Sequence, residues 1–247
     1  MTPVAWSGHV VSIQPRIRLT RSFGERSHSY LGYAVRLDGE VGGQAGEFSV
    51  GIGPTVLAKH ELMAGDHGAG LAVPVPDPRL EPVGCYRTSK LRVIGRAPGD
   101  PHPQPPRLGL PPILRVYRER GHRRLDALTY EAKCATCVWG VRTPVELIPD
   151  QWKPDRRRYR FETLLYGPKS CPLYRAGATR KVQVRKPDMV QEEEDWIDEE
   201  ATGAPAPRRV AVGRIRLGLD WPGAGRYARS LPGSTDHGSR RHAAADP

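Results

Sequence analysis

Three cysteines are the residues of this sequence with the clearest capacity for chemistry. Cys134 and Cys137 form a C-x2-C pair, and Cys171 follows after a gap of 33 residues. A C-x2-C pair places two thiolates on one tight turn, which is the spacing that a tetrahedral zinc ion or an iron–sulfur cluster needs. A third thiolate would close such a site from another strand. The spacing therefore predicts a metal-stapled module.

Structural zinc takes four ligands, so three cysteines leave one position open. The two candidates for it are His122, which lies twelve residues before Cys134, and the more distant Cys85. His122 is nearer in sequence, whereas Cys85 would tie the N-terminal part of the chain to the module. We expect the ligands to be Cys134, Cys137, Cys171 and His122, with Cys85 as the alternative to the histidine.

The cysteine turn resembles the knuckle of zinc ribbons, although Cys171-Pro172 supplies no second C-x2-C pair. A cysteine followed by proline is similar instead to the motifs of iron–sulfur ferredoxins. These resemblances imply zinc as the cofactor, with an iron–sulfur cluster as the alternative. Two other readings stay open: three buried cysteines without a ligand, or Cys137 or Cys171 as a catalytic thiol whose pKa a basic environment lowers.

Positive charge is concentrated around the cysteines. Residues 113–186 contain 18 Lys and Arg against 7 Asp and Glu, and the resulting excess of +11 equals the net charge of the whole chain. Such a regional excess is typical of a nucleic-acid-binding surface, because guanidinium groups pair with phosphates and tyrosine rings stack on free bases. The alternative is a basic face that contacts only water. The residues expected to bind RNA or DNA, single-stranded or structured, are Arg156, Arg157, Arg158, Tyr159, Arg160, Lys181, Arg185 and Lys186.

The N-terminal region, residues 1–96, alternates apolar and polar residues in five stretches, which predicts five β-strands. The stretches are 8–19, 30–37, 47–52, 70–75 and 90–94. The segment 64–70 resembles the Gly-Asp turn that leads into a strand in OB-fold and translation-factor barrels. The resemblance implies an OB-like small barrel, in which Tyr30 and Tyr33 either form a base-stacking platform or pack in the core.

Composition divides the rest of the chain. Residues 97–112 contain seven prolines, which exclude a regular helix and indicate a stiff, extended linker. Residues 113–186 are expected to be a basic, β-rich module with the cysteines on its turns. Residues 187–247 begin with an acidic run and continue rich in Ala, Gly, Pro and Arg, which predicts a disordered tail. Trp196 and Ile197 within the acidic run are possible anchors for a protein partner.

Several other functional classes lack a signal in this sequence. No run of 18 apolar residues occurs, and the N-terminus has neither the charged start nor the apolar segment of a signal peptide. We therefore expect a cytoplasmic protein with reduced thiols and no membrane contact. Neither G-x-S-x-G nor G-x-x-x-x-G-K-[ST] is present. We favour a mainly β, non-enzymatic nucleic-acid-binding protein with structural zinc; the alternative is an iron–sulfur or thiol-dependent enzyme, or an accessory subunit of one.

Overall fold

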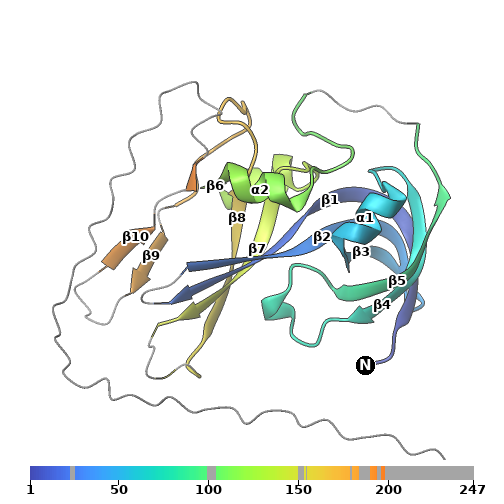
Figure 1. Ribbon diagram of the computed structural model, residues 1–247, viewed down its shortest axis with the longest axis horizontal. Coiled ribbons are helices and arrows are strands. Elements are labelled where there is room, and N and C mark those ends of the chain that lie inside the picture. The colour runs from blue at the N-terminus through green and yellow to red at the C-terminus, as the bar shows by residue number, and fades with distance from the viewer. Residues whose placement is uncertain are drawn as a thin grey trace, which may run out of the picture. The chain divides into compact units, whose positions relative to one another are not determined.

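Strands dominate the structure, a computed structural model (Figure 1). Nine of the described strands form one sheet. The order of neighbours is β11-β6-β8-β7-β1-β2-β3-β5-β4. The structure describes residues 1–22, 26–98, 104–149, 153, 155–178, 180–183, 190–193 and 196–197. All of them lie within Met1–Ala206, the first of two units of the chain. No helix in these ranges is both long enough and apolar enough to cross a membrane.

The five stretches predicted as strands in the N-terminal region are all strands. They are β1 (Val4–Ser22), β2 (Arg26–Val41), β3 (Gln44–Ile52), β4 (His67–Pro74) and β5 (Cys85–Gly95). β1 pairs with β2 along most of its length and also with β4 through residues 4–9. β3 pairs with β2 and, at one position, with β5, which in turn pairs with β4. The pairing therefore returns to its first strand in the cycle β1-β2-β3-β5-β4-β1, with helix α1 (Pro54–His60) between β3 and β4 in the chain.

A bulge in β1 decides which of its side chains enter the core. Residues on one face of a strand alternate, so Val10 and Ile13 could not both point inward in a regular strand. Both are buried, because the register with β2 shifts between Val10 and Ser12. Beyond the shift Ile17 and Leu19 continue the buried row. The bulge thus lets β1 contribute to the core over its whole length.

The second half of the chain extends the same sheet. Its elements are α2 (Leu114–Arg120), β6 (Gly121–Arg124), α3 (Ala127–Thr129), the π-helical turn η2 (Tyr130–Cys134), β7 (Gly140–Ile148) and β8 (Arg158–Leu165). β7 runs parallel to the end of β1, with Leu19 opposite Val145, and β8 pairs with β7. The proline-rich segment is fastened as well, since the Tyr33 hydroxyl donates to the carbonyl oxygen of Pro112 at 2.9 Å. Strands β6, β7 and β8 therefore share one sheet with the strands of residues 1–96.

Short strands also occur beyond β8. They are β9 (Arg180–Gln183), β10 (Val190–Glu193) and β11 (Trp196–Ile197). β10 pairs with β9, and β11 pairs with β6 through Trp196 opposite His122. Two short pieces of the predicted disordered tail are therefore strands, and the rest of 187–247 lies outside the described residues.

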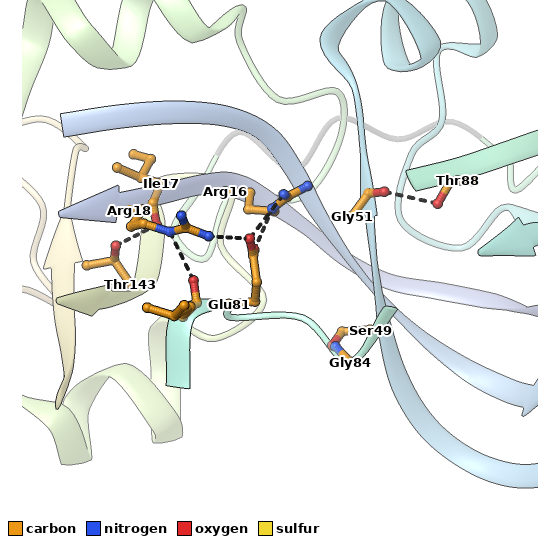
Figure 2. Close-up of polar contacts among 10 residues, drawn as sticks. Arg16, Ile17, Arg18, Ser49, Gly51, Glu81, Gly84, Thr88 and Thr143 are labelled. Atoms are coloured by element: carbon orange, nitrogen blue, oxygen red, sulfur yellow. Dashed lines mark hydrogen bonds and ion pairs between the residues drawn. The ribbon is translucent and has the colours of Figure 1, made fainter. Parts of the chain in front are cut away.

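A buried ion-pair triad fastens the loop between β4 and β5 to β1 (Figure 2). The carboxylate of Glu81, which follows the 3-10 helix η1 (Pro78–Leu80), accepts from Arg16 Nε at 2.8 Å and from Arg18 Nη2 at 2.7 Å. Arg18 Nε also donates to the carbonyl oxygen of Leu80 at 3.2 Å. Glu81 is only 8% exposed and Arg16 only 11% exposed, so water compensates little if the pair is broken.

Replacing Glu81 with alanine should strongly destabilise the fold. Because the change leaves the Arg16 guanidinium buried without its counter-charge, we expect Glu81→Ala to lower the free energy of unfolding by about 3–5 kcal/mol. The matched control is Glu119→Ala, which removes the 60% exposed partner of Arg115 and should cost less than about 1 kcal/mol. Urea unfolding measures both values. Equal costs for the two variants would contradict a structural role for the triad.

Candidate functional site

The first two cysteines lie on a turn that follows a capped helix. The Asp126 carboxylate accepts the backbone N–H of Thr129 at 2.9 Å and caps α3, which continues into the π-helical turn that ends at Cys134. The N–H of Cys137 then donates to the carbonyl oxygen of Cys134 at 3.1 Å, and the N–H of Gly140 donates to that of Cys137 at 3.0 Å. We call residues 134–140 the cysteine turn.

Gln14 of β1 holds the cysteine turn in place. Its side-chain Nε2 donates to the carbonyl oxygens of Cys134 and Cys137, at 3.0 and 2.9 Å. Its Oε1 accepts the Tyr130 hydroxyl at 2.7 Å. All of these bonds are buried, so each contributes to fixing the turn against the sheet. Nothing in the sequence pattern singles out Gln14, which lies 120 residues away from Cys134.

The three thiols lie close enough to influence one another. Burial raises the pKa of Cys134 to about 11, and the neighbouring Cys137 and Cys171 add to that rise. Burial also raises the pKa of Cys137; backbone N–H groups, including that of Arg107 at 3.3 Å from the sulfur, oppose the rise, and Cys171 adds to it. Three of the four predicted ligands are therefore neighbours. Within the described ranges, however, no group of three or more His, Cys, Asp or Glu side chains has an arrangement that could hold a metal ion.

The two candidates for a fourth ligand lie in other surroundings. The His122 ring packs against the rings of His28 and Tyr166, with centroids 5.1 and 5.6 Å away. Cys85 is buried in β5, in the core of the first five strands. Cys85 does not belong to the apolar cluster around Cys134, whose members are Leu125, Tyr130, Leu165, Ala135, Trp139, Cys171 and Tyr174.

The arginines at the start of β8 differ in how far their charges are compensated. Arg156 and Arg158 are exposed and form no ion pair with any residue that the structure describes. Arg157 donates to the Glu146 carboxylate at 2.7 Å, and this contact raises the pKa of the guanidinium. Arg160 pairs with Glu162. Half of this predicted cluster is therefore neutralised by acidic neighbours.

The other residues predicted to bind nucleic acid are Tyr159, Lys181, Arg185 and Lys186. The Arg79 guanidinium lies 4.8 Å from the centre of the Tyr159 ring and covers one of its faces. Lys181 lies in β9, of which only the backbone is described, and Arg185 and Lys186 lie outside the described residues. One face of the Tyr159 ring is therefore already covered by an arginine.

A pocket of about 320 Å³ lies beside the cysteine turn and is lined by residues of β1, β2, β3 and β7 and by Ala135 of the turn. Two guanidinium groups, those of Arg36 and Arg142, line it together with a single carboxylate, Glu131. Both cations lie near Tyr130: burial raises the pKa of its phenol to about 12, and Arg142 and Arg36 offset part of that rise. The remaining lining residues are Ser12, Gln14, Pro15, Ala34, Ser49, Pro82, Tyr130 and Ala135.

No protein-family model, no curated protein and no solved structure matches this chain. Its function has to be inferred from the chemistry of its own residues. The cysteine cluster offers soft sulfur donors, which favour zinc or an iron–sulfur cluster. The pocket offers two fork-shaped cations, which favour phosphate or carboxylate groups.

Gly140 has no room for a side chain. A Cβ at this position would lie 2.3 Å from the carbonyl oxygen of Cys134 and 3.1 Å from Gln14 Nε2. We expect Gly140→Ala to displace the cysteine turn, to lower the free energy of unfolding by about 1–3 kcal/mol, and to expose the buried thiols. Urea unfolding and the rate of reaction with a disulfide reagent measure these effects.

The control for this prediction is Gly53→Ala. Position 53 has an extended backbone, and a Cβ there meets no atom within 4 Å. This variant should change the free energy of unfolding by less than about 1 kcal/mol and should leave the thiol reactivity unchanged. A Gly140→Ala protein that behaves in the same way would show that the turn tolerates a Cβ.

Proposed function

We propose that this chain is a non-enzymatic protein that binds single-stranded or structured RNA or DNA through an OB-like barrel. The pairing cycle β1-β2-β3-β5-β4-β1, with α1 between β3 and β4, supports such a barrel. OB-folds bind oligonucleotides on the face of their second and third strands, between the loops that join strands 1–2 and 4–5. That face is the first place to look for a ligand.

The observation that carries the proposal is the position of the pocket. Its lining includes Arg36 of β2, Ser49 of β3 and Pro82 of the loop between β4 and β5. These are the strands and one of the loops that an OB-like barrel uses for oligonucleotides. The excess of guanidinium over carboxylate groups in the same lining favours an anionic ligand.

Exposed arginines extend the expected contact surface beyond the pocket. Arg156 and Arg158 form no ion pair with a described residue, so a phosphate can pair with either. Arg157 already pairs with Glu146 and has less to gain from a phosphate. The second candidate function, an iron–sulfur or thiol-dependent enzyme or its accessory subunit, rests on the cysteine cluster alone.

Single substitutions of neighbouring arginines should separate free from compensated charges. Each phosphate contact on a single strand contributes about 0.7 to the slope of log affinity against log salt concentration, because bound counterions are released. We expect Arg156→Gln and Arg158→Gln each to flatten the slope by about this amount. Arg157→Gln, which changes the net charge equally, should flatten it less. Fluorescence anisotropy with a labelled oligonucleotide between 50 and about 300 mM salt measures the slopes.

Two results would count against this proposal. Identical slopes for all three variants would mean that ion pairing to Glu146 does not distinguish Arg157 from its neighbours. An original chain that binds no oligonucleotide at low salt would exclude nucleic-acid binding itself.

We also propose zinc as the cofactor, held by Cys134, Cys137 and Cys171. Thiols are the donor type that a thiophilic metal prefers, and a bound ion would have to draw the three together, because no group in the described residues is arranged to hold one. Burial raises the pKa of Cys137, and the backbone N–H groups directed at its sulfur oppose part of that rise. A bound ion would cross-link the cysteine turn to the segment around Cys171 and add to the stability of the fold. His122 stays the proposed fourth ligand, and an iron–sulfur cluster is the alternative cofactor. We propose a reducing cytoplasm as the compartment, since all four cysteines are free thiols.

Metal analysis of the purified chain tests this proposal. Protein prepared without oxygen should contain close to one equivalent of zinc, and Cys134→Ser or Cys137→Ser should lose it because a ligand is removed. Cys85→Ser, the matched control, should keep it, since Cys85 lies in the core of the first five strands. A brown protein that absorbs near 400 nm would instead identify an iron–sulfur cluster, and a chain free of zinc and iron would exclude both.

The acidic run has a proposed role as the contact for a protein partner. Its first residues form β10 beside β9, and Trp196 and Ile197 form β11 along β6. These parts of the acidic run therefore lie beside basic segments of the same chain. A partner protein would have to displace them from β9 and β6.

A further inference from the structure

We infer that the pocket beside the cysteine turn holds one unstacked nucleotide of the bound strand, with a phosphate group between Arg36 and Arg142. This inference rests on the proposed function and adds to it a place and a stoichiometry. It also involves residues of the second half of the chain, because Tyr130, Glu131, Ala135 and Arg142 lie outside the five barrel strands.

The size of the pocket suits a single nucleotide. Its volume of about 320 Å³ lies at the small end of the range for small-molecule sites, about 300–1,000 Å³. A base within a duplex is stacked and paired and cannot enter such a space, whereas a base in a single strand or loop can be turned outward. The pocket therefore favours unpaired nucleic acid over a duplex.

Arg36 supplies a donor that has no hydrogen-bond partner among the described residues. Its Nε atom is buried and makes no hydrogen bond. The closest carboxylate oxygen, from Glu47, is 3.9 Å away and beyond hydrogen-bonding distance. Leaving a buried donor unsatisfied costs free energy, and a phosphate oxygen in the pocket would recover it.

Arg142 of β7 supplies a second cation to the lining of the pocket. Its guanidinium lies over the Phe161 ring, 4.8 Å from the ring centre, which fixes its plane while its N–H groups stay available at the edge. Arg36 comes from β2 and Arg142 from β7, and both act on the phenol of Tyr130. Two guanidinium groups from the strands on either side of β1 thus line one pocket, and such groups are well suited to share a phosphate.

The other walls suit the flat face of a base. Pro15, Ala34, Pro82 and Ala135 contribute apolar surface to the pocket. The Tyr130 hydroxyl is held by Gln14, so its ring has a fixed position before any ligand arrives. A base can therefore enter without a costly rearrangement of the walls.

The test uses the full chain and a twelve-residue single-stranded DNA with one 2-aminopurine, a base whose fluorescence reports unstacking. Four variants are compared with the original chain: Arg36→Gln, Arg142→Gln, Ala34→Leu and Arg92→Gln. Ala34→Leu fills the pocket without changing charge, and it keeps the test valid if Arg36→Gln does not fold. Arg92 is exposed on β5 and does not line the pocket, so its replacement controls for the loss of one charge.

Each pocket variant should weaken binding about tenfold or more and should reduce the rise in 2-aminopurine fluorescence. Arg92→Gln should stay within about twofold, and a duplex of the same sequence should compete poorly. If the strand binds but the pocket variants behave like Arg92→Gln, or the duplex competes equally, the inference is wrong while the proposed function stands. If no oligonucleotide binds at low salt, the proposed function fails, and this inference fails with it.

Discussion

One strand, β1, carries the pairing on which both halves of the structure depend. Its first residues pair with β4, most of its length pairs with β2, and its last four residues pair with β7. A slip of one residue would turn every side chain of a strand to the opposite face. Because β1 belongs to the cycle of five strands and to the sheet beside the cysteine turn, its register sets both at once. The buried row of Val10, Ile13, Ile17 and Leu19 and the bonds of Gln14 specify that register.

The strands could be predicted from the sequence where apolar and polar residues alternate regularly. Contacts between residues that are distant in the sequence could not be predicted. The five N-terminal stretches were found because their apolar and polar residues alternate, yet β1 extends to Ser22, beyond the predicted end at residue 19. Arg16 and Arg18 occupy polar positions of the alternation, and only the structure shows that both pair with the buried loop residue Glu81. The helices α1 and α2 are too short to give a periodic signal.

The candidate site could likewise be predicted only in part. The spacing of Cys134 and Cys137 is local, so their turn could be predicted, whereas the pocket forms only when β2 and β7 are placed around it. Charge pattern also has a limit: Arg156 and Arg157 are indistinguishable in sequence, and an acidic residue on β7 separates them. Closeness along the chain suggested His122 as the fourth ligand, which stays a prediction, whereas the contacts of its ring with His28 and Tyr166 join distant segments and could not be predicted.

The side chain of Gln14 is a junction between two surfaces, since it lines the pocket and also binds the cysteine turn. Both bonds to the turn need a donor, because their partners are carbonyl oxygens. A glutamate has nearly the same shape but, when ionised, only acceptors, so it would set a negative charge against two carbonyl groups. An oxygen of the glutamate could still accept the hydrogen bond from the Tyr130 hydroxyl, so Tyr130 would keep its place in the pocket wall. The carboxylate would, however, repel the carbonyl oxygens of the cysteine turn. The position therefore admits an amide and rejects its closest isostere.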